Sequence, residues 1–61
     1  MKDEELFNKT FANLPIPERS NPIYVDSQYG VMSWNVVWIE VRAGTEVGTR
    51  AIKFLKEQKI L

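Results

Sequence analysis

The chain is short and contains neither cysteine nor histidine, and this combination restricts its fold and chemistry more than any other feature. At 61 residues it lies near the lower size limit for a domain that folds unaided, so we expect one domain over residues 1–61. Disulfides, thiol nucleophiles, imidazole catalysis and the usual zinc or haem sites are excluded, and we expect no cofactor. The fold must therefore rest on large apolar side chains or on a second copy of the chain.

Large aromatic side chains are available for such a core. They are Phe7, Phe11, Tyr24, Tyr29, Trp34, Trp38 and Phe54. Hydrophobic residues make up 44% of the chain and charged residues 26%, a usage typical of globular domains. The sequence therefore predicts a small soluble domain of mixed helices and strands.

The first segment predicts a short amphipathic helix followed by an extended connector. Phe7, Phe11 and Leu14 are spaced at i, i+4 and i+7, the period of one helix face. Asp3 is the expected N-cap, and the proline after Leu14 is expected to end the helix. Three prolines within residues 15–22 predict that this stretch is extended.

A small β-hairpin is expected next, followed by a segment with two interpretations. Residues 23–25 are β-branched or aromatic and favour a strand that ends at Asp26. Residues 26–30 have the composition of a turn. Residues 31–42 fit a long strand, but residues 23–26 are too short to pair with it. Residues 31–42 also fit a helix capped by Ser33 and ended by Gly44, with an apolar stripe at helical spacing: Trp34, Val37, Trp38 and Val41. We favour the helix.

The last segment predicts a second amphipathic helix directly after Gly44. Thr45 is the expected N-cap, and lysines lie toward the negative end of the helix. The apolar stripe consists of Val47, Ala51, Phe54 and Leu55, with Ile52 at its edge, and Gly48 is expected to allow a neighbouring element to pack closely. The predicted fold is α+β: a short helix, a hairpin and two helices joined at Gly44, with the long-strand arrangement α-β-β-α as the alternative.

Catalysis is not expected. The carboxylates offer no spacing that forces two of them together as acid and base, and Glu46–Arg50 and Lys53–Glu57 instead have the i,i+4 spacing of surface ion pairs. A chain this small is also not expected to form a pocket of ~300 Å³ or more. We therefore predict that the protein is not an enzyme.

A nucleic-acid-binding role is the second hypothesis, because charge divides unevenly along the neutral chain. Residues 1–30 have a net charge of −2 and residues 31–61 of +2. Two helices joined at Gly44 resemble a helix-turn-helix, and residues 49–53 are similar to the second helix of ribbon-helix-helix proteins. Each resemblance covers at most half of the chain. Together the two resemblances imply DNA contact through Arg42, Arg50, Lys53 and Lys56.

The leading hypothesis is a protein-interaction module that binds a second copy or another protein. Aromatic anchors dominate many interfaces, and the candidate contact residues are Trp34, Trp38, Val41 and Phe54. The tryptophans also fit a core position, and in a dimer the core and the interface can be one surface. The longest apolar run, residues 36–39, is too short to cross a bilayer, and residues 1–5 lack a signal-like apolar stretch. We therefore expect no membrane partner and a cytoplasmic location.

Overall fold

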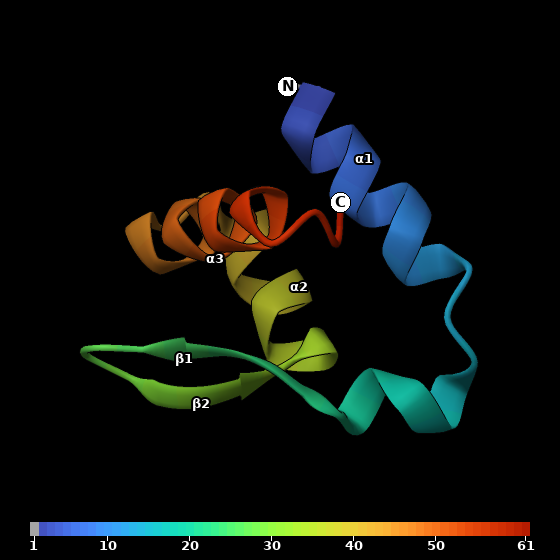
Figure 1. Cartoon of the computed structure of the whole chain (residues 1–61), viewed down its shortest axis with the longest axis horizontal. Helices are drawn as coiled ribbons and strands as arrows, with labels where there is room; N and C mark the ends of the chain where they lie inside the picture. Colours follow the sequence, from blue (N-terminus) through green and yellow to red (C-terminus); the bar gives the residue numbers. More distant parts are fainter. Residues whose placement is uncertain (1) are drawn as a thin grey trace.

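The chain folds as a helix, an antiparallel hairpin and two further helices, in the predicted order (Figure 1). The computed structural model describes residues 2–61. Its elements are α1 (Lys2–Ala12), the 3₁₀ helix η1 (Ile16–Ser20), β1 (Pro22–Asp26), β2 (Gly30–Ser33), α2 (Trp34–Ala43) and α3 (Glu46–Glu57). The alternative of a long strand over residues 31–42 is wrong, because β2 ends at Ser33 and helix α2 follows at once.

The change from strand to helix at Ser33 has a local cause. Ser33 is the register partner of Pro22, the first residue of β1, so later residues have no strand residue opposite them. The Ser33 hydroxyl accepts a hydrogen bond from the Val36 backbone N–H at 3.3 Å. This bond satisfies one of the free donors in the first helical turn. The predicted N-cap at Ser33 is therefore confirmed.

The junction between α2 and α3 is tight. Gly44 ends α2 with φ 71° and ψ 29°, a left-handed conformation that glycine adopts without a steric penalty. Thr45 caps α3, its hydroxyl accepting the Gly48 N–H at 3.2 Å. A Cβ at Gly48 would lie 2.8 Å from the carbonyl carbon and oxygen of Glu40. The predicted end of α2 at Gly44 and the predicted N-cap of α3 at Thr45 are confirmed. The expected close packing at Gly48 is confirmed as well.

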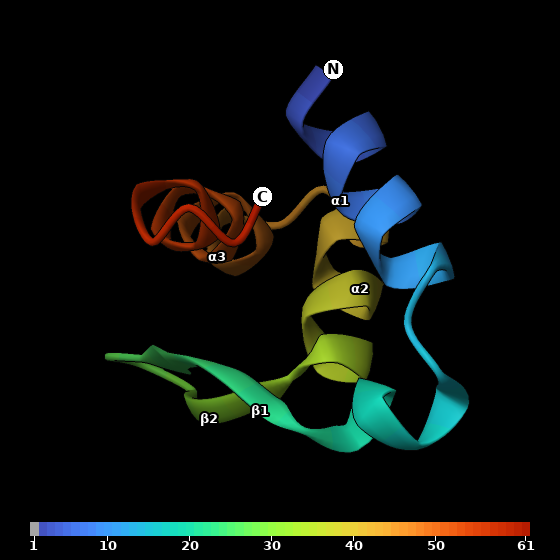
Figure 2. The same ribbon diagram turned by 45° about the vertical axis from the view of Figure 1, so that its right-hand side comes forward.

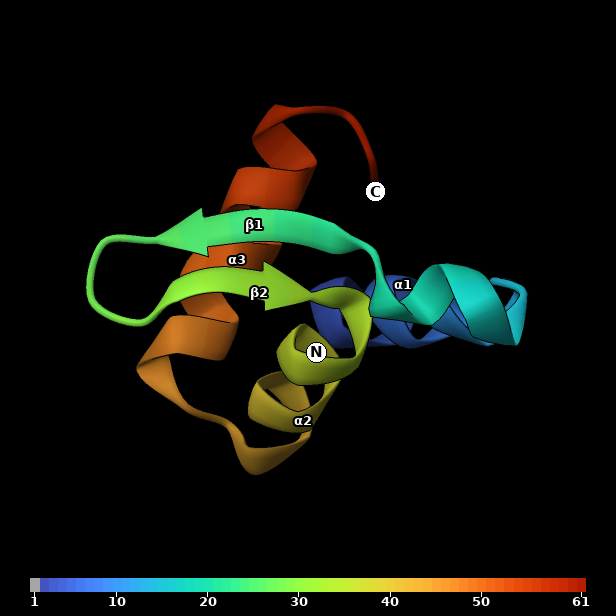
Figure 3. The same ribbon diagram turned by 90° about the horizontal axis from the view of Figure 1, so that it is seen from below.

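The hairpin turns one face toward α3 and the other away from it. Tyr24 is opposite Met32 in the register, and Val25 is opposite Val31. Met32 is buried, and the Tyr24 ring lies 5.3 Å from the Phe54 ring of α3 between centroids. Because side chains alternate across a strand, the Val25–Val31 pair lies on the outer face. Figure 3 shows the two strands crossing in front of α3.

The core lies between the three α-helices and the inner face of the hairpin. Figure 2 shows α2 in the centre, with α1 and α3 on opposite sides and the hairpin beneath. Aromatic rings link α1 to α2, with centroid distances of 5.8 Å for Phe7–Trp34 and 5.3 Å for Phe11–Trp38. The buried hydrophobic residues are Phe7, Phe11, Met32, Trp34, Val37, Val41, Val47, Ala51, Ile52 and Leu55. The aromatic core therefore closes within one copy of the chain.

Two local predictions are wrong. Asp3 does not cap α1 but lies in its first turn, where its charge still favours the helix dipole and its carboxylate pairs with Lys56 at 3.0 Å. The connector over residues 15–22 is not fully extended, because it contains η1. Proline is compatible with the first turn of a helix, and Pro17 takes that place in η1. Across residues 2–61, no helix has the length and apolar character needed to span a membrane.

Candidate functional site

Asp26 holds the hairpin against α3. It lies at the end of β1 with 2% of its surface exposed, and its carboxylate accepts five hydrogen bonds. The Tyr24 hydroxyl donates at 2.9 Å, and the backbone N–H groups of Gln28 and Tyr29 donate at 2.9 and 3.1 Å. Arg50 of α3 donates from Nε at 3.1 Å and from Nη2 at 3.3 Å. One carboxylate thus joins the strand, the turn and the helix.

The electrostatics of this cluster are those of a structural anchor. The Arg50 guanidinium, with help from the backbone N–H of Gln28 and the Tyr24 hydroxyl, holds the pKa of Asp26 well below its ordinary 3.8, against the effect of burial. Burial and the adjacent Asp26 carboxylate raise the pKa of Tyr24 above 10.0, so the phenol keeps the proton that it donates. A carboxylate that stays charged and accepts five bonds is poorly suited to take a proton from a substrate.

The hairpin carries three exposed side chains, which we call the hairpin face: Val25 and Val31 on the outer side of the strands and Tyr29 in the turn. Their exposed fractions are 69%, 67% and 66%, in that order. Residues 22–39 contain one charged residue, Asp26, and that residue is buried. The segment that carries the hairpin face therefore has no exposed charge.

The side chains expected to contact a partner lie mostly inside the fold. Trp34 is 8% exposed and Val41 is 4% exposed, because α2 turns this stripe toward the core. Trp38 and Phe54 are partly buried and pack against the core cluster. Of the four candidate residues, two are thus covered within one copy of the chain. Exposed apolar surface on α2 instead comes from Val36 and Ile39, which are 43% and 55% exposed.

The four candidate nucleic-acid contacts do not form a carboxylate-free basic patch. Arg50 pairs with Asp26 and Lys56 pairs with Asp3, while the Arg42 guanidinium lies 4.7 Å from the centre of the Trp38 ring. Lys53 lies beside a cavity that Asp3 and two glutamates also line. The basic side chains are therefore interleaved with acidic ones.

The prediction of ion pairs between Glu46 and Arg50 and between Lys53 and Glu57 along α3 is wrong. Within residues 2–61 the ion pairs are Asp26–Arg50 and Asp3–Lys56. Arg50 reaches the buried carboxylate of the hairpin, which offers it two oxygens, rather than the exposed Glu46 one turn away on its own helix. Lys53 and Glu57 likewise do not form the expected pair. No group of three acidic residues in the described part of the chain could hold a metal ion.

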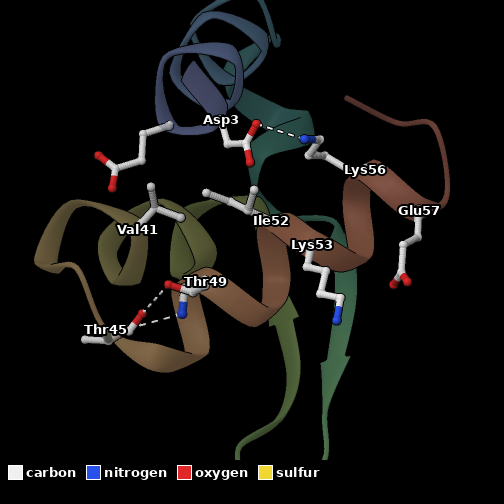
Figure 4. A pocket seen from close by; sticks show the side chains of 10 residues that line it. Asp3, Val41, Thr45, Thr49, Ile52, Lys53, Lys56 and Glu57 are labelled. Carbon is white, nitrogen blue, oxygen red and sulfur yellow. Dashed lines mark hydrogen bonds and ion pairs between the residues drawn. The ribbon is translucent and has the colours of Figure 1, made fainter. Parts of the chain in front are cut away.

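A cavity of about 320 Å³ lies between the first turn of α1, the end of α2 and α3. Its apolar floor consists of Val41, Gly48 and Ile52, and Thr45 and Thr49 line one side. Figure 4 shows Asp3 and Lys56 on the opposite side, joined by their ion pair. The expectation that so short a chain forms no cavity of this size is wrong, because three helices that cross at different angles leave space where α1 meets α3.

Comparison with protein-family models, curated proteins and solved structures finds no match. The sequence analysis missed the Asp26–Arg50 pair, because 24 residues separate its members and no local spacing connects them. A signal was present nonetheless: Asp26 is the only charge in residues 22–39, and a lone charge in an apolar stretch needs a partner when it is buried.

Proposed function

We propose that the chain is a non-catalytic protein-interaction module that self-associates through the hairpin face. The observation that carries this proposal is the Val25–Val31 pair, which is apolar and two-thirds exposed and lies in a segment, residues 22–39, without an exposed charge. Exposed apolar patches on small soluble domains commonly mark interaction sites. The Asp26–Arg50 pair supports the proposal, because it presents the hairpin face outward on a fixed element.

A second copy of the chain is the partner that fits this face best. An uncharged face meets its own copy without like-charge repulsion, and the whole chain has no net charge that would keep copies apart. A standard interface covers about 800 Å² per partner, roughly a fifth of the chain's 4294 Å² of surface. Val36 and Ile39 are further exposed apolar side chains, on helix α2.

The nucleic-acid-binding alternative has weaker support. Its helix-turn-helix or ribbon-helix-helix form needs a basic surface that neutralises phosphates. Arg50 and Lys56 are each bound to a carboxylate, so a phosphate would have to displace both. Salt-dependent binding of this chain to duplex DNA would revive the alternative.

Sedimentation equilibrium on variants of the hairpin face tests the proposal. We expect the unmodified chain to have a mass well above 7.1 kDa at high concentration. Val25→Lys and Val31→Lys should each return it to the monomer, because a lysine in the interface would lose its hydration. Ile16→Lys is the matched control, since Ile16 is 76% exposed on η1. Dissociation by the control variant alone, or by none of the three, contradicts the proposal.

A further inference from the structure

We propose that a hollow along the last turns of α2 binds a small organic anion, a carboxylate attached to a compact apolar group. The hollow has a volume of about 300 Å³ and is lined by Trp38, Ile39, Arg42 and Ala43. This volume is at the lower end of the range of small-molecule sites. The lining contains a guanidinium and no carboxylate, unlike that of the larger cavity between α1 and α3. The hairpin contributes none of its residues, so binding in the hollow does not depend on self-association.

The aromatic side of the hollow is held in place by stacked rings. The Trp38 ring lies nearly parallel to the Phe11 ring of α1, with 7° between their planes and 5.3 Å between their centroids. Phe11 belongs to the buried core, and the Arg19 guanidinium lies 4.6 Å from the centre of its ring. Trp38 is therefore a fixed support for the side chain that lies over it.

Arg42 supplies the charge that a carboxylate needs. Its guanidinium lies 4.7 Å from the centre of the Trp38 ring, and both side chains line the hollow. Within residues 2–61, the hydrogen bonds that cationic side chains donate come from Arg19, Arg50 and Lys56, and the ion pairs use the last two of these. The N–H groups of Arg42 are thus available to a ligand. A guanidinium matches the two oxygens of a carboxylate in a bidentate pair.

The negative charge around the hollow does not cancel that of Arg42. The acidic residues nearest to it in the sequence are Glu40 and Glu46, and neither lines the hollow. The Glu40 carboxylate accepts a hydrogen bond from the Thr45 hydroxyl at 2.9 Å. The C-terminal end of α2 contributes roughly half a negative charge, which is less than the full positive charge of the guanidinium. A singly charged anion is therefore attracted.

The aliphatic side chains of the hollow favour a ligand with an apolar group. Ile39 is 55% exposed, and Ala43, four residues later on the same helix, is exposed as well. Residues at this spacing are neighbours on one helix face. A compact ring next to the carboxylate would cover both side chains and remove their surface from water. Acetate would pair with Arg42 but leave this surface exposed.

Four probes test the proposal by two-dimensional amide NMR: cyclohexanecarboxylate, acetate, cyclohexanol and cyclohexylammonium. We expect cyclohexanecarboxylate to cause saturable shifts at Ile39, Arg42 and Ala43, with a dissociation constant on the order of 1 mM. Acetate lacks the ring and cyclohexanol lacks the charge, so each should bind about tenfold more weakly. Cyclohexylammonium should not bind. Equal or tighter binding of any of the other three probes, or no saturable shift at these amides, overturns the proposal.

Two variants that remove the same charge locate the contact. Arg42→Gln should weaken cyclohexanecarboxylate binding about tenfold, because it removes the bidentate partner of the carboxylate. Lys53→Gln is the matched control: it also removes one positive charge from an exposed helical position, but Lys53 does not line the hollow. Unchanged affinity in the Arg42 variant, or an equal loss in both variants, overturns the assignment of Arg42.

Discussion

Asp26 and Arg50 show how a single pair of side chains fixes the orientation of the hairpin. The pair lies between β1 and α3 and is joined by two hydrogen bonds. The Arg50 side chain is 39% exposed, whereas that of Asp26 is fully buried. Without Arg50, Asp26 would be a buried and unpaired charge, which destabilises the folded chain.

Asp26 should make stability fall as the solution becomes acidic. Its pKa lies below its ordinary 3.8 in the folded chain, so the unfolded chain takes up the proton first as pH falls. The contribution of the Asp26 carboxylate to stability is complete above its pKa in the unfolded chain. It is lost as the pH falls through its pKa in the folded chain. Asp26→Asn should lower the urea midpoint at neutral pH and flatten the decline below about pH 5.

Urea denaturation at several pH values measures this effect. Asp3→Asn is the control, because its pair with Lys56 is about half exposed and such pairs contribute little. An Asp26→Asn variant with the stability and acid sensitivity of the unmodified chain would show that the pair does not anchor the hairpin.

Gly48 of α3 lies against the backbone of α2 at Glu40 and Val41. Gly48→Ala would place a methyl group 2.8 Å from the Glu40 backbone, which cannot move without shifting the helix. We expect a loss of about 2 kcal/mol in the free energy of unfolding, the usual cost of overpacking. Lys53→Ala, at an exposed position of the same helix, should change it by less than about 0.5 kcal/mol. A neutral or stabilising Gly48→Ala would contradict this packing.

The single-residue signals that the sequence predicts correctly are local ones. Ser33, Gly44 and Thr45 act on backbone groups within a few residues, so their roles can be inferred from neighbouring positions. The interactions that sequence reasoning missed are long-range: Arg50 binds Asp26 rather than Glu46, and Asp3 binds Lys56 rather than capping α1. Only the packing of elements brings these partners together.

At the scale of elements, the N-caps decide where α2 and α3 begin. Ser33→Ala and Thr45→Ala should each lower the free energy of unfolding by about 1 kcal/mol. The Thr45 loss should be the larger, because that hydroxyl also donates to Glu40. Thr10→Ala is the control, since Thr10 bonds within α1 to Leu6 and alanine favours helices. Thermal unfolding of the three variants checks this order, and equal losses would contradict it.

The helix–strand ambiguity over residues 31–42 is resolved by the length of β1 rather than by propensity. Valine, isoleucine and tryptophan in residues 36–39 favour a strand locally. A strand needs a partner, however, and the register ends at Pro22. The same segment instead buries Trp34, Val37 and Val41 as helix α2. Sequence reasoning identified the helix from this limit but could not identify which apolar side chains stay exposed.

At the scale of the whole molecule, charged and apolar surfaces are separated along the chain. Residues 22–39 provide the hairpin and most of α2 with a single, buried charge, while residues 2–19 and 40–59 carry the remaining acidic and basic side chains. The sequence left open whether core and interface are one surface. Because Trp34 and Val41 are buried within one copy, the proposed self-association needs another exposed apolar surface, and the hairpin face provides one.

The most direct test of self-association through the hairpin face follows the amide NMR spectrum of the unmodified chain on dilution. We expect the signals of Val25, Tyr29 and Val31 to shift with concentration, because these residues enter and leave the interface, while the Ile16 signal stays constant. A spectrum that does not change from micromolar to millimolar concentration would contradict the proposal. Shifts that occur only away from the hairpin face would contradict it as well.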